Sequence, residues 1–312
     1  HLPRTSAPGE RIHTDVSMVS HPSLSGGRYF VTFIDDFSRH VSVEILKSKD
    51  EATTALLNYV AYVEKHIGRP VKFVHSDRGG EYISRELKAE LKKRGIIQDQ
   101  PAAYHPASNG IAERMNRTLC DSARAMILTA VALKIPCASQ LWGEAVNLAA
   151  YIYNRIRRPG KKLTPHELFT GKKPTVSHLA PFGSVTYALK HGPQIKKGDK
   201  FVSRTRLGYL VGYGEYPSLY RVFMPDSGLI AELRDATFAP FSCSATSSSA
   251  SGTQHQPVLL DQPSSRLGHS DVNTDAAEPS DHVSDPDTIH IVTPASHLDV
   301  LDGRCRSPSI VA

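Results

Sequence analysis

The feature that most constrains the fold of this chain is the order of strand-like and helix-like hydrophobic patterns along its first half. β-rich runs of a few residues occur in four places: 12–18, the hairpin-like segment 28–47, 71–77 and 96–98. Helical patterns, with apolar residues three and four positions apart, occupy four further segments: 49–66, 84–94, 109–130 and 138–154. This order predicts an α/β domain in which a mixed sheet is covered by helices.

Composition divides the remainder of the 312 residues. Residues 1–10 are interpreted as an N-terminal remnant or linker, and the α/β domain is expected to occupy 11–155. Residues 156–180 form a basic, proline-bearing connector, and residues 181–241 contain short β-like runs that predict a small β-barrel-like module. Residues 242–312 are acidic, rich in Ser and Pro and poor in aromatic residues, which predicts a disordered tail.

The formal net charge of +6 conceals an asymmetry along the chain. Residues 242–312 contain three Arg, no Lys, eight Asp and one Glu, so residues 1–241 carry 34 of the 37 basic and 22 of the 31 acidic side chains. A basic body suggests a polyanionic partner such as nucleic acid, although an ordinary solvated surface explains the charge equally well. No apolar run approaches the roughly 20 residues that span a bilayer, so no membrane partner is expected.

Three acidic residues stand where an α/β sheet can bring distant segments together. Asp15 lies within the first β-rich run, Asp77 ends a later run just before two glycines, and Glu113 lies near a helix start. Each has an ordinary explanation by itself, as a strand-edge acid, a turn acid and a carboxylate favoured by the helix dipole. Converging carboxylates would repel one another unless cations lie between them, and Mg²⁺ or Mn²⁺, as a pair of ions, suits such oxygen ligands.

The helix that begins near Asn109 presents Glu113 away from its apolar stripe. At ~100° per residue, Glu113 falls ~200° from Ile111, which belongs to that stripe. Asn116 and Arg117 share the face of Glu113, and Asn109 is expected to cap the helix. Glu113 is therefore free to face the strand ends across a groove.

Seven stretches between residues 8 and 240 form a recognisable series. They read IHTDVS, GGRYFVTFIDDFSRHVSVEILKSKDEA, VKFVHSDRGGEYIS, NGIAERMNRTL, LWGEAVNLAAYIYNR, TPHELFTGKKPTVSHLAPFG and RLGYLVGY. In their order and spacing, including the 35 residues between Asp77 and Glu113, they resemble the integrases of copia-type LTR retrotransposons. Those integrases belong to the wider retroviral integrase and transposase superfamily.

The resemblance implies an RNase H-like core, with Asp15, Asp77 and Glu113 as catalytic residues and metal ligands. It implies two-metal chemistry on DNA, namely trimming of the element's 3′ ends by water and attack of the 3′-hydroxyl on target DNA. It further implies a homo-oligomer, an origin within a Pol polyprotein, and action in the nucleus, reached through cytoplasmic particles.

Six polar residues are predicted to contact DNA: Asn109, Arg114, Asn116, Arg117, Lys161 and Lys162. The cations among them would position the phosphate backbone without reading sequence, and a solvated cationic face is the ordinary alternative for each one singly. Asp35 and Asp36 are interpreted as hairpin acids rather than metal ligands, because turns favour Asp on local grounds.

Two other functions fit parts of the sequence. A non-catalytic nucleic-acid-binding remnant of a retroelement would keep the fold without the chemistry. An RNase H-type nuclease would use the same carboxylates for hydrolysis alone, but the matching stretches continue into the β module, which favours an integrase. Metal-dependent strand transfer separates the integrase hypothesis from both.

Overall fold

The computed structural model describes most of the first 239 residues, in the ranges 4–77, 79–82, 84–99, 109–189, 203–214, 216, 218–234 and 236–239. These residues belong to one compact unit of the chain. The predicted disordered tail, 242–312, lies outside the described residues.

A mixed sheet of five strands, in the order β3-β2-β1-β4-β5, forms the first part of the fold. Its strands are β1 (Arg11–Met18), β2 (Tyr29–Asp35), β3 (Val41–Leu46), β4 (Phe73–His75) and β5 (Ile97–Asp99). The predicted hairpin makes β2 and β3 antiparallel, and β1 pairs antiparallel with β2. By contrast, β4 lies parallel to β1 and β5 lies parallel to β4, because helical segments connect them.

Four helices flank this sheet: α1 (Glu51–His66), α2 (Arg85–Lys93), α3 (Gly110–Ala132) and α4 (Trp142–Arg155). Each lies within a few residues of its predicted range. At the start of α2, Ser84 Oγ accepts a hydrogen bond from the Leu87 N–H at 3.1 Å, and after its end Gly95 has a φ of 71°, which suits glycine. Among the described helices, none is long and apolar enough to cross a membrane.

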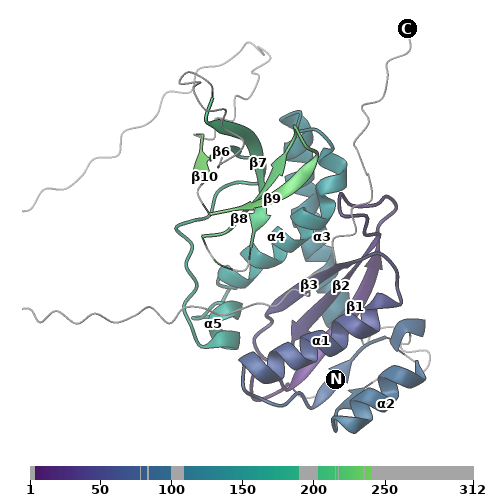
Figure 1. Ribbon diagram of the computed structural model, residues 1–312. Coiled ribbons are helices and arrows are strands. Elements are labelled where there is room, and N and C mark those ends of the chain that lie inside the picture. The colour runs from purple at the N-terminus through teal and green to yellow at the C-terminus, as the bar shows by residue number, and fades with distance from the viewer. Residues whose placement is uncertain are drawn as a thin grey trace, which may run out of the picture. The chain divides into compact units, whose positions relative to one another are not determined.

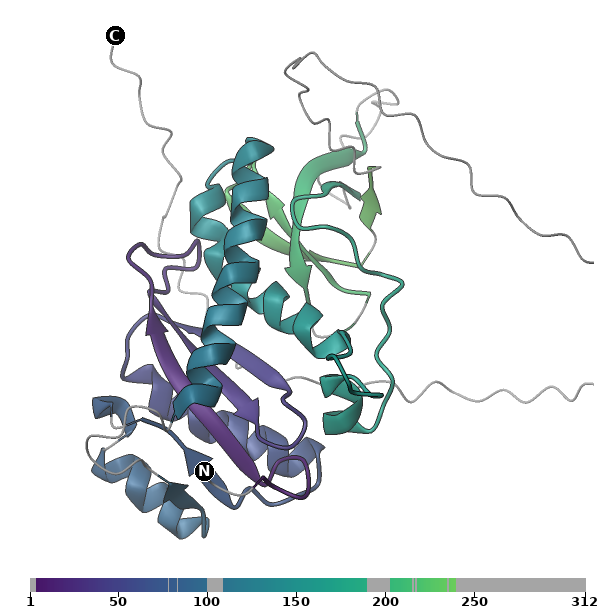
Figure 2. The same cartoon turned by 180° about the vertical axis from the view of Figure 1, so that it is seen from behind.

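Strand β2 shows how the sequence sets the two faces of the sheet. Side chains alternate along a strand, so Phe30 and Ile34 enter one hydrophobic cluster while Val31 and Phe33 enter the other. The first cluster contains residues of α3 and α4, and the second contains residues of α1 and α2. Figure 1 shows α1 over one face of the sheet, and Figure 2 shows α3 over the opposite face.

A second sheet follows, built from antiparallel pairs in the order β10-β6-β7-β8-β9. Its strands are β6 (Val185–Leu189), β7 (Thr205–Tyr213), β8 (Tyr220–Met224), β9 (Leu229–Leu233) and β10 (Ala236–Phe238). The single β-like run expected at 229–238 therefore forms two strands. The predicted fold class, an RNase H-like mixed sheet with flanking helices followed by an all-β module, is confirmed.

The predicted connector, 156–180, contains a helix that the sequence analysis did not assign, α5 (Pro165–Thr170). Thr164 Oγ1 accepts a hydrogen bond from the Glu167 N–H at 3.1 Å, and the Glu167 carboxylate accepts one from the Thr164 N–H at 2.8 Å. This reciprocal capping box, with proline in the first turn, is a signal that the sequence Thr-Pro-His-Glu already carries.

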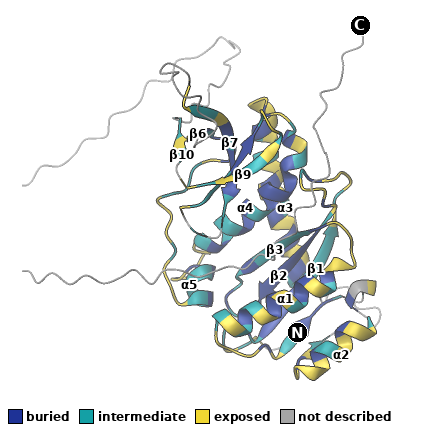
Figure 3. Ribbon diagram, in the orientation of Figure 1, coloured by how far each residue is buried: buried dark blue, intermediate teal, exposed yellow. Residues whose placement is uncertain are grey.

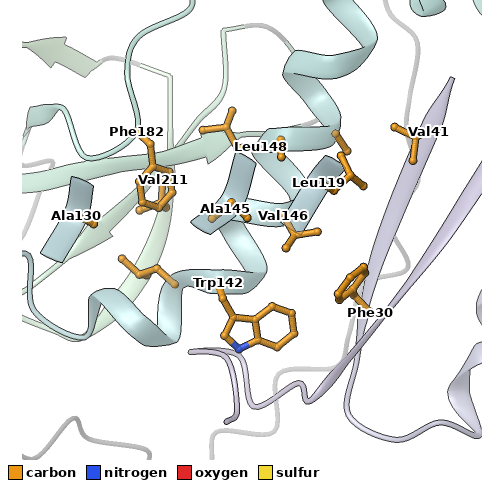
Figure 4. Close-up of a cluster of buried hydrophobic side chains, with 14 of the residues drawn as sticks. Phe30, Val41, Leu119, Ala130, Trp142, Ala145, Val146, Leu148, Phe182 and Val211 are labelled. Carbon is orange, nitrogen blue, oxygen red and sulfur yellow. The ribbon is translucent and has the colours of Figure 1, made fainter. Parts of the chain in front are cut away.

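Helix α4 is buried on most sides because α3, β3 and β7 all pack against it. Figure 3 shows its ribbon largely in the colour of buried residues. Figure 4 draws part of the cluster around it, in which Trp142 and Val146 of α4 lie near Phe30 of β2, and Ala145 lies near Val211 of β7. One apolar helix thus contributes to the core of both sheets.

Two buried polar side chains of α4 bond to elements on either side of it. Asn154 Oδ1 accepts a hydrogen bond from the Val41 N–H at 2.9 Å, and its Nδ2 donates to the Val41 carbonyl at 2.8 Å. The Glu144 carboxylate accepts two hydrogen bonds from the Arg221 guanidinium of β8, each 2.8 Å. Asn154 therefore satisfies the outer edge of β3, and Glu144 ties α4 to the second sheet.

Replacing Asn154 with alanine is expected to lower the free energy of unfolding by about 2–3 kcal/mol, because two buried backbone groups of Val41 lose their partner. Urea unfolding followed by circular dichroism measures the change. The matched control is Asn147→Ala on the same helix, a partly buried position with no side-chain bond inside the described residues. Equal losses in both variants would contradict this role for Asn154.

Candidate active site

Asp15 lies in the middle of β1 and faces α3. Its Cα pairs with that of Thr32 on β2. Its Oδ2 accepts a hydrogen bond of 2.8 Å from Asn116 Nδ2 of α3, and the same nitrogen donates to Ser17 Oγ at 3.0 Å. Because side chains alternate along a strand, Asp15 and Ser17 share the face that α3 covers.

Asp77 follows β4, the strand that lies parallel to β1. The Cα partners are Arg11 with Phe73 and His13 with His75. The pairing ends at His75, two residues before Asp77, and the negative charge of Asp77 still acts on Asp15. Beyond the strand, Asp77 Oδ1 accepts a hydrogen bond from the Gly79 N–H at 2.9 Å.

Glu113 lies in the first turn of α3, near enough to Asp15 for its charge to act on that carboxylate. Asn109 and Asn116, four residues before it and three after it, lie on the same helical face. Asn109 Nδ2 donates to the Thr14 carbonyl at 3.4 Å, and Asn116 bonds Asp15. Both anchors hold α3 against β1, which Figure 2 shows crossing each other, and the negative charge of Glu113 acts on Asp15.

The pKa of Asp15 reflects its burial and its acidic neighbours. Burial, together with the negative charges of Asp77 and Glu113, raises the pKa of Asp15 from 3.8 to about 6. The hydrogen bond from Asn116 acts in the opposite direction and favours the charged carboxylate. Asp15 is partly buried and Glu113 is exposed, so the group opens to solvent on the helix side.

The donor set fits a hard divalent cation in its chemistry. Three mutually repelling carboxylates are oxygen ligands of the kind that Mg²⁺ and Mn²⁺ prefer, and a cation would relieve the repulsion that raises the pKa of Asp15. Within the described part of the chain, no group of three or more His, Cys, Asp or Glu side chains has drawn together closely enough to hold a metal ion. The metal site therefore stays a prediction.

Asp35 and Asp36 have structural roles at the β2–β3 turn, as the sequence analysis expected. The Asp35 carboxylate accepts hydrogen bonds from the Gly9 N–H at 2.7 Å and from the Ser38 hydroxyl at 2.6 Å. Asp36 is bonded by the Thr5 N–H at 3.0 Å and lies 3.2 Å from His13 Nε2. Both carboxylates therefore stabilise the turn through these contacts.

The residues predicted to contact DNA fall into two groups. Arg114, Arg117, Lys161 and Lys162 are exposed, whereas Asn109 and Asn116 are buried. Asn109 precedes α3 but makes no side-chain capping bond, so the expectation that it caps the helix is wrong; its amide bonds the Thr14 carbonyl instead. The DNA contacts themselves remain predictions.

Sequence reasoning missed the residues that hold Asp15 in place. Thr32 Oγ1 donates to Asn116 Oδ1 at 2.8 Å, so the Asn116 amide bridges β1 and β2. The sequence did mark Thr32 as a candidate for a buried polar contact, because it is the polar residue in the apolar run 30–34 of β2. Sequence reasoning also missed the pair Thr14 and Tyr82, whose hydroxyl oxygens lie 2.8 Å apart.

Residues 5–106 match the family model of the integrase core domain. The chain carries an integrase core domain. It is 37% identical over 219 residues to the retrovirus-related Pol polyprotein from transposon TNT 1-94 of Nicotiana tabacum, a match that covers 69% of this chain and 16% of that protein. Identity to the corresponding polyprotein from transposon RE2 of Arabidopsis thaliana is 27% over 218 residues, covering 69% of this chain and 14% of that one.

The chain thus spans about one sixth or less of the length of these curated relatives. Among solved structures, the integrase catalytic core domain of HTLV-2 in complex with magnesium, in a dimeric form, has 20% sequence identity and a TM-score of 0.39. The match covers 53% of this chain and 99% of that one. Within the integrase core of this chain, Asp15 and Asp77 fall inside the matched residues 5–106, and Glu113 falls just beyond them.

Asp15→Asn is expected to stabilise the metal-free integrase core at alkaline pH. The folded-state pKa of Asp15 is raised, so its stabilising contribution is present below about pH 4 and is lost as the pH rises through about 6. Above that pH the variant, which lacks the charge, should melt roughly 2–6 °C higher in EDTA, and the difference should disappear near pH 4.

Thermal melts at several pH values measure this effect. Asp121→Asn is the matched control, because Asp121 is an exposed residue of α3 paired with Arg124 at 2.6 Å. A variant at position 15 that melts at or below the wild-type temperature at pH 8 would contradict the repulsion between the three carboxylates.

Proposed function

We propose that this protein is a retrotransposon integrase that binds DNA and catalyses divalent-metal-dependent 3′-end processing and strand transfer. The observation that supports the proposal is the convergence of Asp15, Asp77 and Glu113, expressed in the strand register and in the raised pKa of Asp15. The integrase core domain supports the reaction class, which is polynucleotidyl transfer.

In this proposal Asp15, Asp77 and Glu113 hold two Mg²⁺ or Mn²⁺ ions. When bound, such ions activate the attacking water or 3′-hydroxyl and stabilise the leaving oxygen on phosphorus. The chain's own residues prepare the site. Asn116 orients the Asp15 carboxylate and favours its charged form, and the Gly79 N–H orients Asp77.

DNA is the proposed substrate, as element ends and as target. Exposed Arg114 and Arg117 stand on α3 close to Glu113, where they would bind phosphates, and Lys161 and Lys162 would add contacts from the connector. We further propose that the protein acts as a homo-oligomer, derives from a Pol polyprotein and works in the nucleus, since integration requires chromosomal DNA.

A strand-transfer assay tests the proposal directly. Purified protein is incubated with a labelled duplex carrying the element's terminal sequence, in Mg²⁺ or Mn²⁺, beside Asp15→Asn, Asp77→Asn and Glu113→Gln. Joined products are expected with the wild type, and each variant should reduce them at least 100-fold because the cations lose a ligand. Asp121→Asn should retain activity.

The outcomes separate the rival functions. Cleaved but never joined DNA would identify a hydrolytic nuclease. DNA binding without cleavage or joining in either metal, in protein supplemented with the upstream part of its polyprotein, would identify a non-catalytic remnant.

Asn116→Ala is expected to raise the Mg²⁺ concentration for half-maximal joining about tenfold, because Asp15 loses the partner that orients it. DNA binding measured in EDTA should stay unchanged, which distinguishes a positioning role from a DNA contact. Weakened DNA binding with an unaltered Mg²⁺ requirement would contradict this role and favour the contact predicted from sequence.

A further inference from the structure

A pocket of about 330 Å³ opens beside the turn that joins β2 to β3. Five of its lining residues are cations: Arg4, Arg39, Arg158, Lys161 and Lys162. Apolar groups form the rest of its wall, among them Phe37 of the turn and Leu163 of the connector. None of the described residues that line it is acidic.

This pocket is separate from the three carboxylates. In the antiparallel register, Ile12 pairs with Asp35 and Asp15 pairs with Thr32, so the turn lies beyond the Arg11 end of β1. From Asp15 back to Arg11 is four residues, or roughly 13 Å at the rise of a strand. The pocket and the three carboxylates therefore lie at different positions along β1.

Arg39 is held in the pocket wall by an uncommon backbone conformation. Its φ is 64°, in the left-handed region that residues with a side chain rarely adopt, and its Nη1 lies 3.2 Å from Asp36 Oδ1. Burial lowers the pKa of Arg39, Asp36 opposes that effect, and the positive charges of Arg4 and Arg158 add to it. Arg4, Arg39 and Arg158 thus line one pocket, and the charges of Arg4 and Arg158 act on Arg39.

Within the part of the chain that the structure describes, the other four cations of the pocket form no ion pair with a carboxylate. Within the described residues, only Arg39 of the five forms an ion pair, and its partner Asp36 is already shared with Arg11 and His13. Crowded cations over an apolar wall are disfavoured unless an anion joins them. The geometry therefore calls for an anionic ligand with an apolar part.

We propose that this pocket binds a phosphodiester of a nucleic-acid strand, with the phosphate among Arg4, Arg39 and Arg158 and the adjoining nucleotide against Phe37 and Leu163. Guanidinium groups match phosphate oxygens in a bidentate geometry, and an aromatic ring accepts a sugar or base. A volume near 330 Å³ lies at the small end of ligand pockets, about 300–1,000 Å³, which suits one nucleotide.

The choice of nucleic acid rests on the proposed function, which makes DNA the polyanion that this chain meets. An acidic protein segment would satisfy the same charges but gains less from a pocket of nucleotide size. Lys161 and Lys162, predicted from sequence to bind DNA, acquire a specific place in this pocket.

The test is fluorescence anisotropy of a labelled DNA duplex over a range of NaCl concentrations, in EDTA so that the carboxylate site takes no part. Arg4→Gln/Arg158→Gln is compared with the wild type and with Lys65→Gln, which removes an exposed cation of α1. The double variant should bind roughly tenfold more weakly, with a log–log salt slope shallower by about one for each phosphate that it no longer neutralises. Lys65→Gln should match the wild type.

Arg39→Asn provides a second variant that keeps the fold, because asparagine tolerates the left-handed conformation. It should weaken DNA binding in the same direction while the melting temperature stays within a few degrees. Unchanged affinity and salt slope in both variants would overturn the proposal. So would variants that lose binding to a labelled Glu-rich peptide but keep DNA affinity, since the pocket would then serve a protein partner.

Failure of this inference is distinguishable from failure of the proposed function. Loss of DNA affinity in the pocket variants, with no joining by the wild type, would leave the pocket intact as a nucleic-acid site and reject the integrase activity. DNA joining that requires Glu113 but is unchanged in the variants of Arg4, Arg39 and Arg158 would support the integrase activity and reject the pocket as a nucleic-acid site.

Discussion

The enclosure of α4 is the constraint on which the rest of the structure depends. An apolar helix that meets α3, β3 and β7 at once must be buried on several sides, and Trp142, Ala145 and Leu148 provide the surface for that. Its two buried polar groups are satisfied in opposite directions, Asn154 by the Val41 backbone and Glu144 by Arg221. Because α3 packs against α4, its first turn is held over β1.

That placement brings charges together that would separate in water. Asp15 lies in a strand, Asp77 follows a strand and Glu113 lies in a helix. Burial, together with the charges of Asp77 and Glu113, raises the pKa of Asp15. The fold tolerates the repulsion because Asn116 binds Asp15 and is itself bound by Thr32. In the proposed function, a divalent cation bound by these carboxylates would relieve their repulsion, and that relief would strengthen its binding.

The pocket beside the β2–β3 turn gathers side chains of the opposite charge. Arg4, Arg39 and Arg158 line a pocket that also has an apolar wall. Among the described carboxylates, only Asp36 forms an ion pair with one of them, Arg39. Carboxylates that bind cations and cations that bind phosphate would together give DNA two points of attachment. In the proposed function the first supplies chemistry and the second supplies position.

Local patterns in the sequence predicted most of the strands and helices, with limits within a few residues of those observed. Ser84 and Gly95 mark the ends of α2, the alternation along β2 sets both faces of the sheet, and the Thr-Pro-His-Glu capping box of α5 was readable although it was not used. The sequence also singled out the three carboxylates, through their positions and through family resemblance.

Only the tertiary structure determined which polar groups form hydrogen bonds with one another. Asn116 and Asp15 are separated by 101 residues, Asn154 and Val41 by 113, and Arg221 and Glu144 by 77. No periodicity reports such pairs, because each depends on how the helices cross the sheets and on the cost of leaving a buried polar group unpaired. The hydrogen bond from Asn116 to the Asp15 carboxylate is one such pair, and the predicted contact of Asn116 with DNA stays a prediction.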